Sequence, residues 1–393
     1  MTTTTGRRRS RGRVRGGALA AAVAAIASGA ALAGCGSSAS PSSADGPPAS
    51  GAPAASSAPA VSLATTLSTP KDTWAIVPMS SDPAFWEVFV RPAASATWRL
   101  VTPPGVADNG GLVAATDNAS GLTVAVRPSQ DLGFTPVAST ADAGASWSTD
   151  GPISDGVASS PGALAVSGRQ LAAVLGNGTI EASSNAGASW GTLAKPGTIA
   201  ASAAGQKCGT VHVASVSFGP IPSQVLAAGD CGATGTAGLF AYSAGDGWQR
   251  VSLPVSGQLV RLGAGTALVR AKAGLTALWA DDAAGWTASA ALPVTKPVTA
   301  SGGLAGATPA SAGGMWVLLP GGQAATIGGP GQQWLLLPPT PAHTSVLASG
   351  PGTALDALAV SGSTLTVWQL DRGSTVWAKA QIISVPIQLG SSS

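Results

Sequence analysis

Side chains that could support acid–base or metal chemistry are few in this sequence. It contains two histidines, His212 within an apolar run and His343 near prolines. Metal sites of the zinc type need several ligands at short characteristic spacings, which two isolated histidines do not provide. We therefore predict no metal site and no cofactor.

Carboxylates are equally sparse. Hydrolysis by paired carboxylates requires two acids held about 5–10 Å apart. The only glutamates after residue 35 are Glu87 and Glu181. The aspartates close to turn glycines are Asp230, Asp246 and the pair Asp281-Asp282. We expect these aspartates to satisfy turn backbone, and we assign no catalytic residue.

Cys208 and Cys231 flank two apolar runs, VHVASVSF and QVLAAGD. If these runs form an antiparallel hairpin with a turn at Gly219-Pro220, the two cysteines face each other. We predict a disulfide, with two unpaired thiols as the alternative. A catalytic cysteine is disfavoured because the nearby Lys207 and His212 form no activating arrangement.

Two turn segments share one pattern, in which a Ser or Thr, an Asp or Asn, a Gly and a Trp recur at fixed spacing. Residues 140–147 are TADAGASW and residues 183–190 are SSNAGASW. The pattern residues are Thr140, Asp142, Gly144, Trp147, Ser183, Asn185, Gly187 and Trp190. An Asp or Asn side chain can accept N–H bonds within a turn, and Gly permits a left-handed backbone. We predict that both segments are folding devices.

This pattern resembles the Asp-box, or BNR repeat, of sialidase-like β-propellers. The resemblance implies a hairpin between the third and fourth strands of a blade. In sialidases it also implies three arginines, a tyrosine nucleophile assisted by Glu, and an Asp acid. Here the single tyrosine, Tyr242, precedes a turn, and Arg91 before Pro92 does not match the family's early arginine motif. No catalytic residue is carried over, and a glycoside hydrolase stays the alternative function.

Tryptophans mark a longer period. Seven of the 12 tryptophans follow small-residue or Gly-rich turns at intervals of 49, 43, 58, 38, 48 and 43 residues. They are Trp98, Trp147, Trp190, Trp248, Trp286, Trp334 and Trp377. Periods of about 40–50 residues containing several short strands are typical of propeller blades.

Short apolar or β-branched runs alternate with Gly, Pro, Ser, Asn and Asp clusters from about residue 63 onward. Gly176-Asn177-Gly178 is a strong hairpin signal between two such runs. No long window has the helical period. We therefore predict an all-β domain over 63–393, a seven-bladed β-propeller, with six or eight blades as alternatives.

The N-terminus has a different character. Six arginines precede an apolar stretch from Ala18 to Ala31, the order found in secretory signals. The stretch ends in Leu32-Ala33-Gly34-Cys35, which resembles the bacterial lipoprotein box. That resemblance implies cleavage before Cys35 and acylation of its thiol. We expect residues 1–35 to be a signal peptide, and the export route is left open between the general and twin-arginine pathways.

Residues 36–62 contain little besides Ser, Ala, Pro and Gly, and we expect a flexible tether. Without the six leader arginines, 14 of the 20 Lys and Arg remain against 17 Asp and Glu. The remainder therefore has no basic excess to attract nucleic acid.

Together these features predict a lipoprotein on the outer face of the cytoplasmic membrane. Its propeller would bind a glycan or protein partner without catalysis. A propeller class that assists assembly of membrane complexes shares such turns, and this likeness favours a binding role. A purely structural wall protein is the third hypothesis.

Overall fold

The computed structural model divides the chain into two units, residues 1–54 and 55–393. It describes residues 65–79, 86–103, 112–118, 121–126, 136–150, 161–209, 211–221, 223–232, 236–281, 285–294, 307–309 and 314–385. All of these lie in the second unit. The predicted signal peptide, Cys35 and the predicted tether lie outside the described residues. In the described part, no helix is long and apolar enough to cross a membrane.

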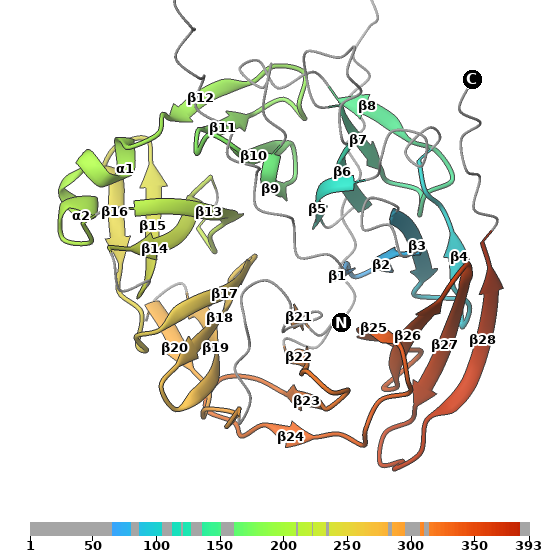
Figure 1. Ribbon diagram of the computed structural model, residues 1–393. Coiled ribbons are helices and arrows are strands. Elements are labelled where there is room, and N and C mark those ends of the chain that lie inside the picture. Colours follow the sequence, from blue (N-terminus) through green and yellow to red (C-terminus); the bar gives the residue numbers. More distant parts are fainter. Residues whose placement is uncertain are drawn as a thin grey trace, which may run out of the picture. The chain divides into compact units, whose positions relative to one another are not determined.

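The described residues form seven four-stranded sheets, each built from consecutive antiparallel strands (Figure 1). Sheet 1 comprises β1 (Thr65–Ser68), β2 (Asp72–Pro78), β3 (Trp86–Pro92) and β4 (Arg99–Leu100). Sheet 2 comprises β5 (Leu112–Asn118), β6 (Gly121–Val126), β7 (Val137–Thr140) and β8 (Ser148–Asp150). Sheet 3 comprises β9 (Pro161–Ser167), β10 (Gln170–Leu175), β11 (Ile180–Ser183) and β12 (Gly191–Ala194). Sheet 4 comprises β13 (Val211–Phe218), β14 (Val225–Cys231), β15 (Thr236–Ser243) and β16 (Gly247–Val251).

The remaining sheets follow the same order. Sheet 5 comprises β17 (Gln258–Gly263), β18 (Thr266–Ala271), β19 (Gly274–Asp281) and β20 (Gly285–Ala288). Sheet 6 comprises β21 (Ala307–Pro309), β22 (Met315–Leu318), β23 (Ala324–Ile327) and β24 (Leu335–Leu336). Sheet 7 comprises β25 (Thr344–Ser349), β26 (Leu355–Ser361), β27 (Thr364–Leu370) and β28 (Ala378–Ser384). Two short helices, α1 (Thr198–Ala201) and α2 (Ala203–Gln206), precede sheet 4 and were not predicted from the sequence.

The core is divided among the seams between neighbouring sheets. Seven buried apolar clusters occur in the described residues, and each joins one sheet to the next. The cluster that contains Ala75, Phe89, Val346 and Leu358 joins sheet 1 to sheet 7, so the sheets close into a ring. This arrangement, visible around the centre of Figure 1, is a β-propeller and confirms the predicted fold class.

The periodic tryptophans have one structural role. Each of the seven lies just before or at the start of the fourth strand of its sheet, in the cluster shared with the preceding sheet. Three of the indole N–H groups donate to a backbone carbonyl just after the fourth strand of the preceding sheet. These bonds are Trp147 to Val101 at 3.1 Å, Trp334 to Ala290 at 3.0 Å and Trp377 to Pro338 at 3.4 Å. A large apolar ring with a polar edge suits this position because it fills the seam and satisfies an outer carbonyl.

Candidate functional site

The histidines and glutamates singled out in the sequence lie apart. His212 is exposed on β13, and His343 lies in the turn before β25 with a φ of 63°. Glu87 on β3 and Glu181 on β11 are buried in sheets 1 and 3. They therefore do not form a hydrolytic carboxylate pair.

Both glutamates are bound to a threonine of the same sheet. The Thr102 hydroxyl donates to Glu87, and the Thr192 hydroxyl donates to Glu181 at 3.1 Å. Burial raises the pKa of Glu87, and the Thr102 bond opposes that shift. In sheet 1 the bond joins β3 to Thr102 just after β4, and in sheet 3 it joins β11 to Thr192 on β12. Both glutamates therefore have a structural role.

The aspartates are also dispersed. Asp230 is paired within β14 rather than in a turn, and Asp281 is the last residue of β19. Asp246 lies in a turn, where it accepts from the Ser243 hydroxyl at 3.0 Å rather than from the backbone. Asp282 lies outside the described residues. Over the described ranges, no group of three or more His, Cys, Asp or Glu could hold a metal ion.

The two residues considered for sialidase chemistry do not meet. Tyr242 on β15 packs against Trp248, with ring centroids 5.2 Å apart and planes tilted by 51°. Arg91 lies near the end of β3, in sheet 1, whereas Tyr242 belongs to sheet 4. Each contacts residues of a propeller seam, and neither faces the other.

A cluster of buried charged and polar side chains lies at the seam of sheets 1 and 7. The Arg91 Nε lies 3.5 Å from Asp356 Oδ2, with both side chains almost fully buried. The Arg91 guanidinium also donates to the Ser349 carbonyl and, at 3.2 Å, to the Ser95 carbonyl. It lies 5.7 Å from the centroid of the Trp98 ring. These contacts connect β3 to the first and second strands of sheet 7.

Burial dominates the electrostatics of this cluster. Desolvation raises the pKa of Asp356 to about 6, although the Trp98 hydrogen bond and the charge of Arg91 both lower it. Desolvation likewise lowers the pKa of Arg91, and Asp356 opposes that shift. In a buried ion pair of this kind each charge compensates the desolvation of the other. Removing one partner leaves the other charge buried and uncompensated, which destabilises the folded state.

Three further hydrogen bonds close the same seam. The Thr66 hydroxyl donates to the Leu347 carbonyl at 2.7 Å. The Gln381 side chain accepts from the Trp98 N–H and donates to the Trp98 carbonyl, both at 2.8 Å. Since every sheet consists of one continuous segment, the ring closes through side chains rather than through strand exchange. Sequence reasoning missed this cluster. Its signal was one charged residue in each of two short, otherwise apolar segments, FVRPA and LDALAV.

The two patterned turns lie between the third and fourth strands of sheets 2 and 3. The Thr140 hydroxyl accepts from the Gly144 N–H at 2.9 Å, and Asp142 accepts from the Ser146 N–H at 2.9 Å. The bonds that Asp142 accepts from the Ser146 hydroxyl, the Ser146 N–H and the Thr140 hydroxyl lower its pKa to about 2. Sheet 3 repeats the geometry with Asn185, which accepts from the Ser189 N–H at 3.0 Å.

Sheet 2 uses its turn to contact sheet 1. A Cβ placed on Gly144, whose φ is +77°, would lie 2.5 Å from the Cβ of Val101. Arg99 of β4 donates to the Ala143 carbonyl at 2.7 Å. The turn is therefore an inter-sheet contact that depends on glycine for both its backbone angle and its close approach.

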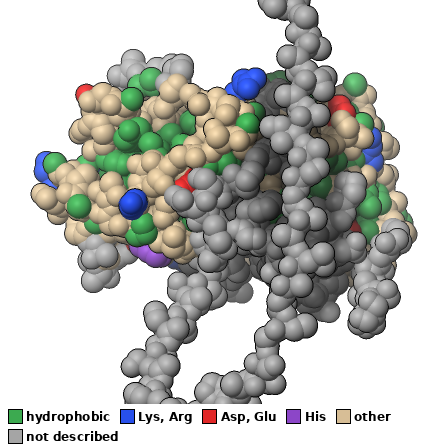
Figure 2. All heavy atoms as spheres, turned by 90° about the horizontal axis from the view of Figure 1, so that it is seen from above, with side chains coloured by type: hydrophobic (Ala, Val, Ile, Leu, Met, Phe, Trp, Pro, Cys, Tyr) green, Lys and Arg blue, Asp and Glu red, His purple; other side chains and the backbone are tan. Residues whose placement is uncertain are grey.

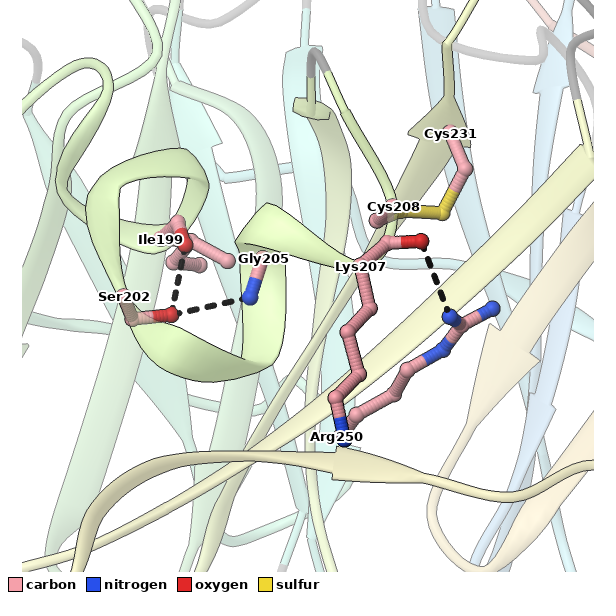
Figure 3. The surroundings of a disulfide bond; sticks show 7 residues. All are labelled: Ile199, Ser202, Gly205, Lys207, Cys208, Cys231 and Arg250. Carbon is pink, nitrogen blue, oxygen red and sulfur yellow. Dashed lines mark hydrogen bonds between the residues drawn. A yellow bond between two sulfur atoms is a disulfide. The ribbon is translucent and has the colours of Figure 1, made fainter.

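A disulfide joins Cys208 to Cys231, with Cα atoms 4.9 Å apart, as predicted (Figure 3). The predicted register was wrong, because Cys231 pairs with Val211 and Cys208 precedes β13. The turn spans Gly219–Gln224, longer than Gly219-Pro220, and it shifts the pairing. The disulfide therefore ties the end of the α1–α2 segment to β14. Gly238 of β15 leaves room for it, since a Cβ there would lie 2.5 Å from Cys231 Sγ.

Apolar side chains reach solvent at the outer strands of two neighbouring sheets. Six large hydrophobics are exposed in the described part, and four of them belong to sheets 6 and 7. These four, here called the outer apolar edge, are Leu335, Leu336, Val376 and Ile382. Leu335 and Leu336 form β24, Ile382 lies on β28, and Val376 lies in the turn before β28. The Trp377–Pro338 bond links the segment just before β28 to the segment just after β24. In the view of Figure 2, charged side chains are few and well separated among apolar and uncharged polar ones.

Comparison with known proteins gives structural likeness only. No family model matches the chain, and no curated protein matches it. A solved structure described as YCF48 bound to D1 peptide is 14% identical, with a TM-score of 0.44 over 68% of this chain and 81% of that one. YCF48 from Cyanidioschyzon merolae is 15% identical, with a TM-score of 0.42 over 80% and 94%. A protein from Lactobacillus plantarum is 12% identical, with a TM-score of 0.49 over 80% and 97%.

Proposed function

We propose that this chain is a lipoprotein, anchored through acylated Cys35 to the outer face of the membrane, whose propeller binds a protein partner without catalysing a reaction. The observation that carries the binding role is the outer apolar edge. Exposed apolar groups that gather on adjacent elements mark interaction sites, whereas scattered ones do not. The buried ion pair of Arg91 with Asp356 joins sheet 1 to sheet 7 and so serves ring closure.

The anchor is supported by the order of arginines, apolar stretch and Leu32-Ala33-Gly34-Cys35. Two or more acyl chains give stable anchoring because each buried methylene contributes about 0.8 kcal/mol. Cell fractionation and mass spectrometry of the N-terminal peptide test it. The acylated peptide should appear in the membrane fraction, and Cys35→Ser should abolish both acylation and retention. A Cys35→Ser chain that stays in the membrane contradicts the anchor.

The binding role is tested by cross-linking on intact cells followed by mass spectrometry. We expect a reproducible partner to be recovered with the native chain and lost with Leu335→Glu or Ile382→Glu. Ile221→Glu is the matched control, because Ile221 is an exposed large hydrophobic residue between β13 and β14 of sheet 4, away from sheets 6 and 7. Equal loss in all three variants, or no loss in any, contradicts the assignment of the outer apolar edge.

A sialidase-like glycoside hydrolase is the alternative, and it rests only on the likeness of the two turns. A panel of fluorogenic glycosides tests it directly. Turnover that Tyr242→Phe abolishes would replace the binding proposal with an enzymatic one.

A further inference from the structure

Basic side chains are concentrated at one end of the ring in sheets 3, 4 and 5. In each sheet the first strand begins at this end, the second and third strands are connected there, and the fourth strand ends there. The described lysines and arginines at these positions, here called the basic face, are Lys195, Lys207, Arg250, Arg270 and Lys272. All are exposed except Arg270, which is half-buried.

Contacts within sheet 4 bring part of the basic face together. The Arg250 guanidinium, near the end of β16, donates to the Lys207 carbonyl at 3.5 Å. Lys207 precedes Cys208, and the disulfide fixes Cys208 to the end of β14 (Figure 3). Lys207 and Arg250 are therefore held on one surface by the disulfide and by β16.

The same surface continues into sheet 5. The Ala237 N–H, at the start of β15, donates to the Gly257 carbonyl at 2.5 Å. A Cβ on Gly257 would lie 2.2 Å from the carbonyl oxygen of Arg270, so the ends of β15 and β18 lie close together. Lys272 follows in the turn between β18 and β19.

Few carboxylates balance these cations. Among the described residues of sheets 4 and 5, Asp230 is the one carboxylate at this end, and Glu181 of sheet 3 is fully buried. At the opposite end of the ring a cation and an acid lie together, as in Asp371-Arg372. The basic face is therefore a local excess of positive charge, although residues 36–393 as a whole contain more Asp and Glu than Lys and Arg.

The chain enters the propeller at the end that carries the basic face. The seven sheets repeat one strand order around the ring, so the start of β1 at Thr65 lies at the same end as the starts of β13 and β17. The segment that precedes Thr65 in the sequence includes the proposed tether and the proposed anchor at Cys35. A membrane anchor is thus connected to the propeller on its basic side.

We propose that the basic face binds the anionic phospholipid headgroups of the membrane in which acylated Cys35 is anchored. This inference rests on the anchor of the proposed function and adds an orientation of the propeller. Each Lys or Arg near an anionic lipid surface strengthens binding about fivefold, and the anchor raises the effective concentration of that surface.

Two further observations favour a lipid surface over an acidic peptide. The cations are distributed over three sheets, which suits a broad anionic surface better than a short segment that would contact only some of them. The outer apolar edge belongs to strands at the rim of the ring, β24 and β28, as Figure 1 shows. A propeller that rests on its basic face therefore leaves the outer apolar edge accessible to a protein partner.

The test is co-sedimentation of residues 36–393 with phospholipid vesicles at low ionic strength. This chain contains every described contact and lacks the leader arginines. Vesicles of phosphatidylcholine and phosphatidylglycerol are compared with vesicles of phosphatidylcholine alone. We expect saturable binding only where phosphatidylglycerol is present, weakened by added salt.

The double variant Lys207→Gln/Lys272→Gln should bind the anionic vesicles about 25-fold more weakly, because it removes two cations of the basic face. Both side chains are exposed, so the variant should fold like the native chain. The matched control is Arg169→Gln/Arg372→Gln, which removes two exposed cations from the opposite end of the ring and should leave vesicle binding unchanged.

Equal loss in the two double variants, equal binding to both kinds of vesicle, or no saturable binding overturns the inference. Binding of a hexaglutamate peptide by a chain that ignores the vesicles also overturns it and assigns the basic face to an acidic protein segment. Acylated Cys35 without vesicle binding would leave the proposed function standing. Vesicle binding by a chain that is not acylated in cells would remove the proposed anchor and leave the lipid surface.

Discussion

The indole N–H of Trp98 donates a 2.9 Å hydrogen bond to the Asp356 carboxylate, which lies 258 residues further along the chain. Trp98 belongs to sheet 1 and Asp356 to sheet 7. At three other seams the corresponding indole donates to a backbone carbonyl. At the closing seam the acceptor is a buried carboxylate that also pairs with Arg91. The seam between the first and last sheets therefore contains a buried ion pair.

Coupling between Arg91 and Asp356 is the first prediction. We expect Arg91→Met and Asp356→Leu each to lower the free energy of unfolding by about 3 kcal/mol, because each leaves an uncompensated buried charge. The double variant should lose less than the sum of the two. Urea unfolding of all four proteins measures the coupling. Strictly additive losses would show that the pair does not act as a unit.

The pH dependence of stability follows from Asp356. Its pKa in the folded protein, about 6, exceeds the ordinary value of 3.8. The folded state therefore holds the proton more tightly, and this contribution to stability is present below about pH 4 and is lost as pH rises through 6. Unfolding free energies of the native chain and Asp356→Asn should accordingly diverge between pH 4 and 6. The native chain should lose stability relative to the variant as pH rises.

This comparison isolates one group. Asp72 and Glu87 also have raised pKa values, and they titrate in both proteins, so their effect cancels. Parallel pH profiles for the two proteins would contradict the assignment of the shift to Asp356.

Gly144→Ala tests the contact between sheets 1 and 2. The substitution combines backbone strain at φ +77° with a clash against Val101. We expect the free energy of unfolding to fall by about 2–5 kcal/mol, the sum of left-handed backbone strain and overpacking. Gly168→Ala is the matched control, since Gly168 has a φ of +61° and nothing within 4 Å of its added Cβ. It should lose only about 1 kcal/mol in thermal or urea unfolding. Similar losses of unfolding free energy in the two variants would contradict a stabilising contact between Gly144 and Val101.

The disulfide supplies a further prediction. A thiol count on the unfolded, non-reduced protein should find none outside Cys35. Replacing Cys208 and Cys231 by serine should cost about 3 kcal/mol, given their separation of 23 residues. Unfolding with and without reductant provides the internal comparison, because the double variant should not respond to reductant. Two free thiols in the native chain would end this prediction.

Local features of the molecule were predictable because neighbouring residues encode them. The runs at 73–79, 85–90 and 171–175 correspond to β2, β3 and β10 with shifts of one or two residues. The hairpin at 176–178 joins β10 to β11. The two patterned turns lie in third-to-fourth-strand hairpins because their side chains bond to backbone only a few residues away.

The sequence by itself determined the all-β character, the spacing of the tryptophans and the pairing of Cys208 with Cys231, since each depends on residue type and short-range order. Only the tertiary structure decided the register behind that disulfide and the partnership of Arg91 with Asp356. These depend on which side chains of different sheets meet at a seam. Ring closure brings such residues together from opposite ends of the domain, and no pattern within either strand specifies its partner.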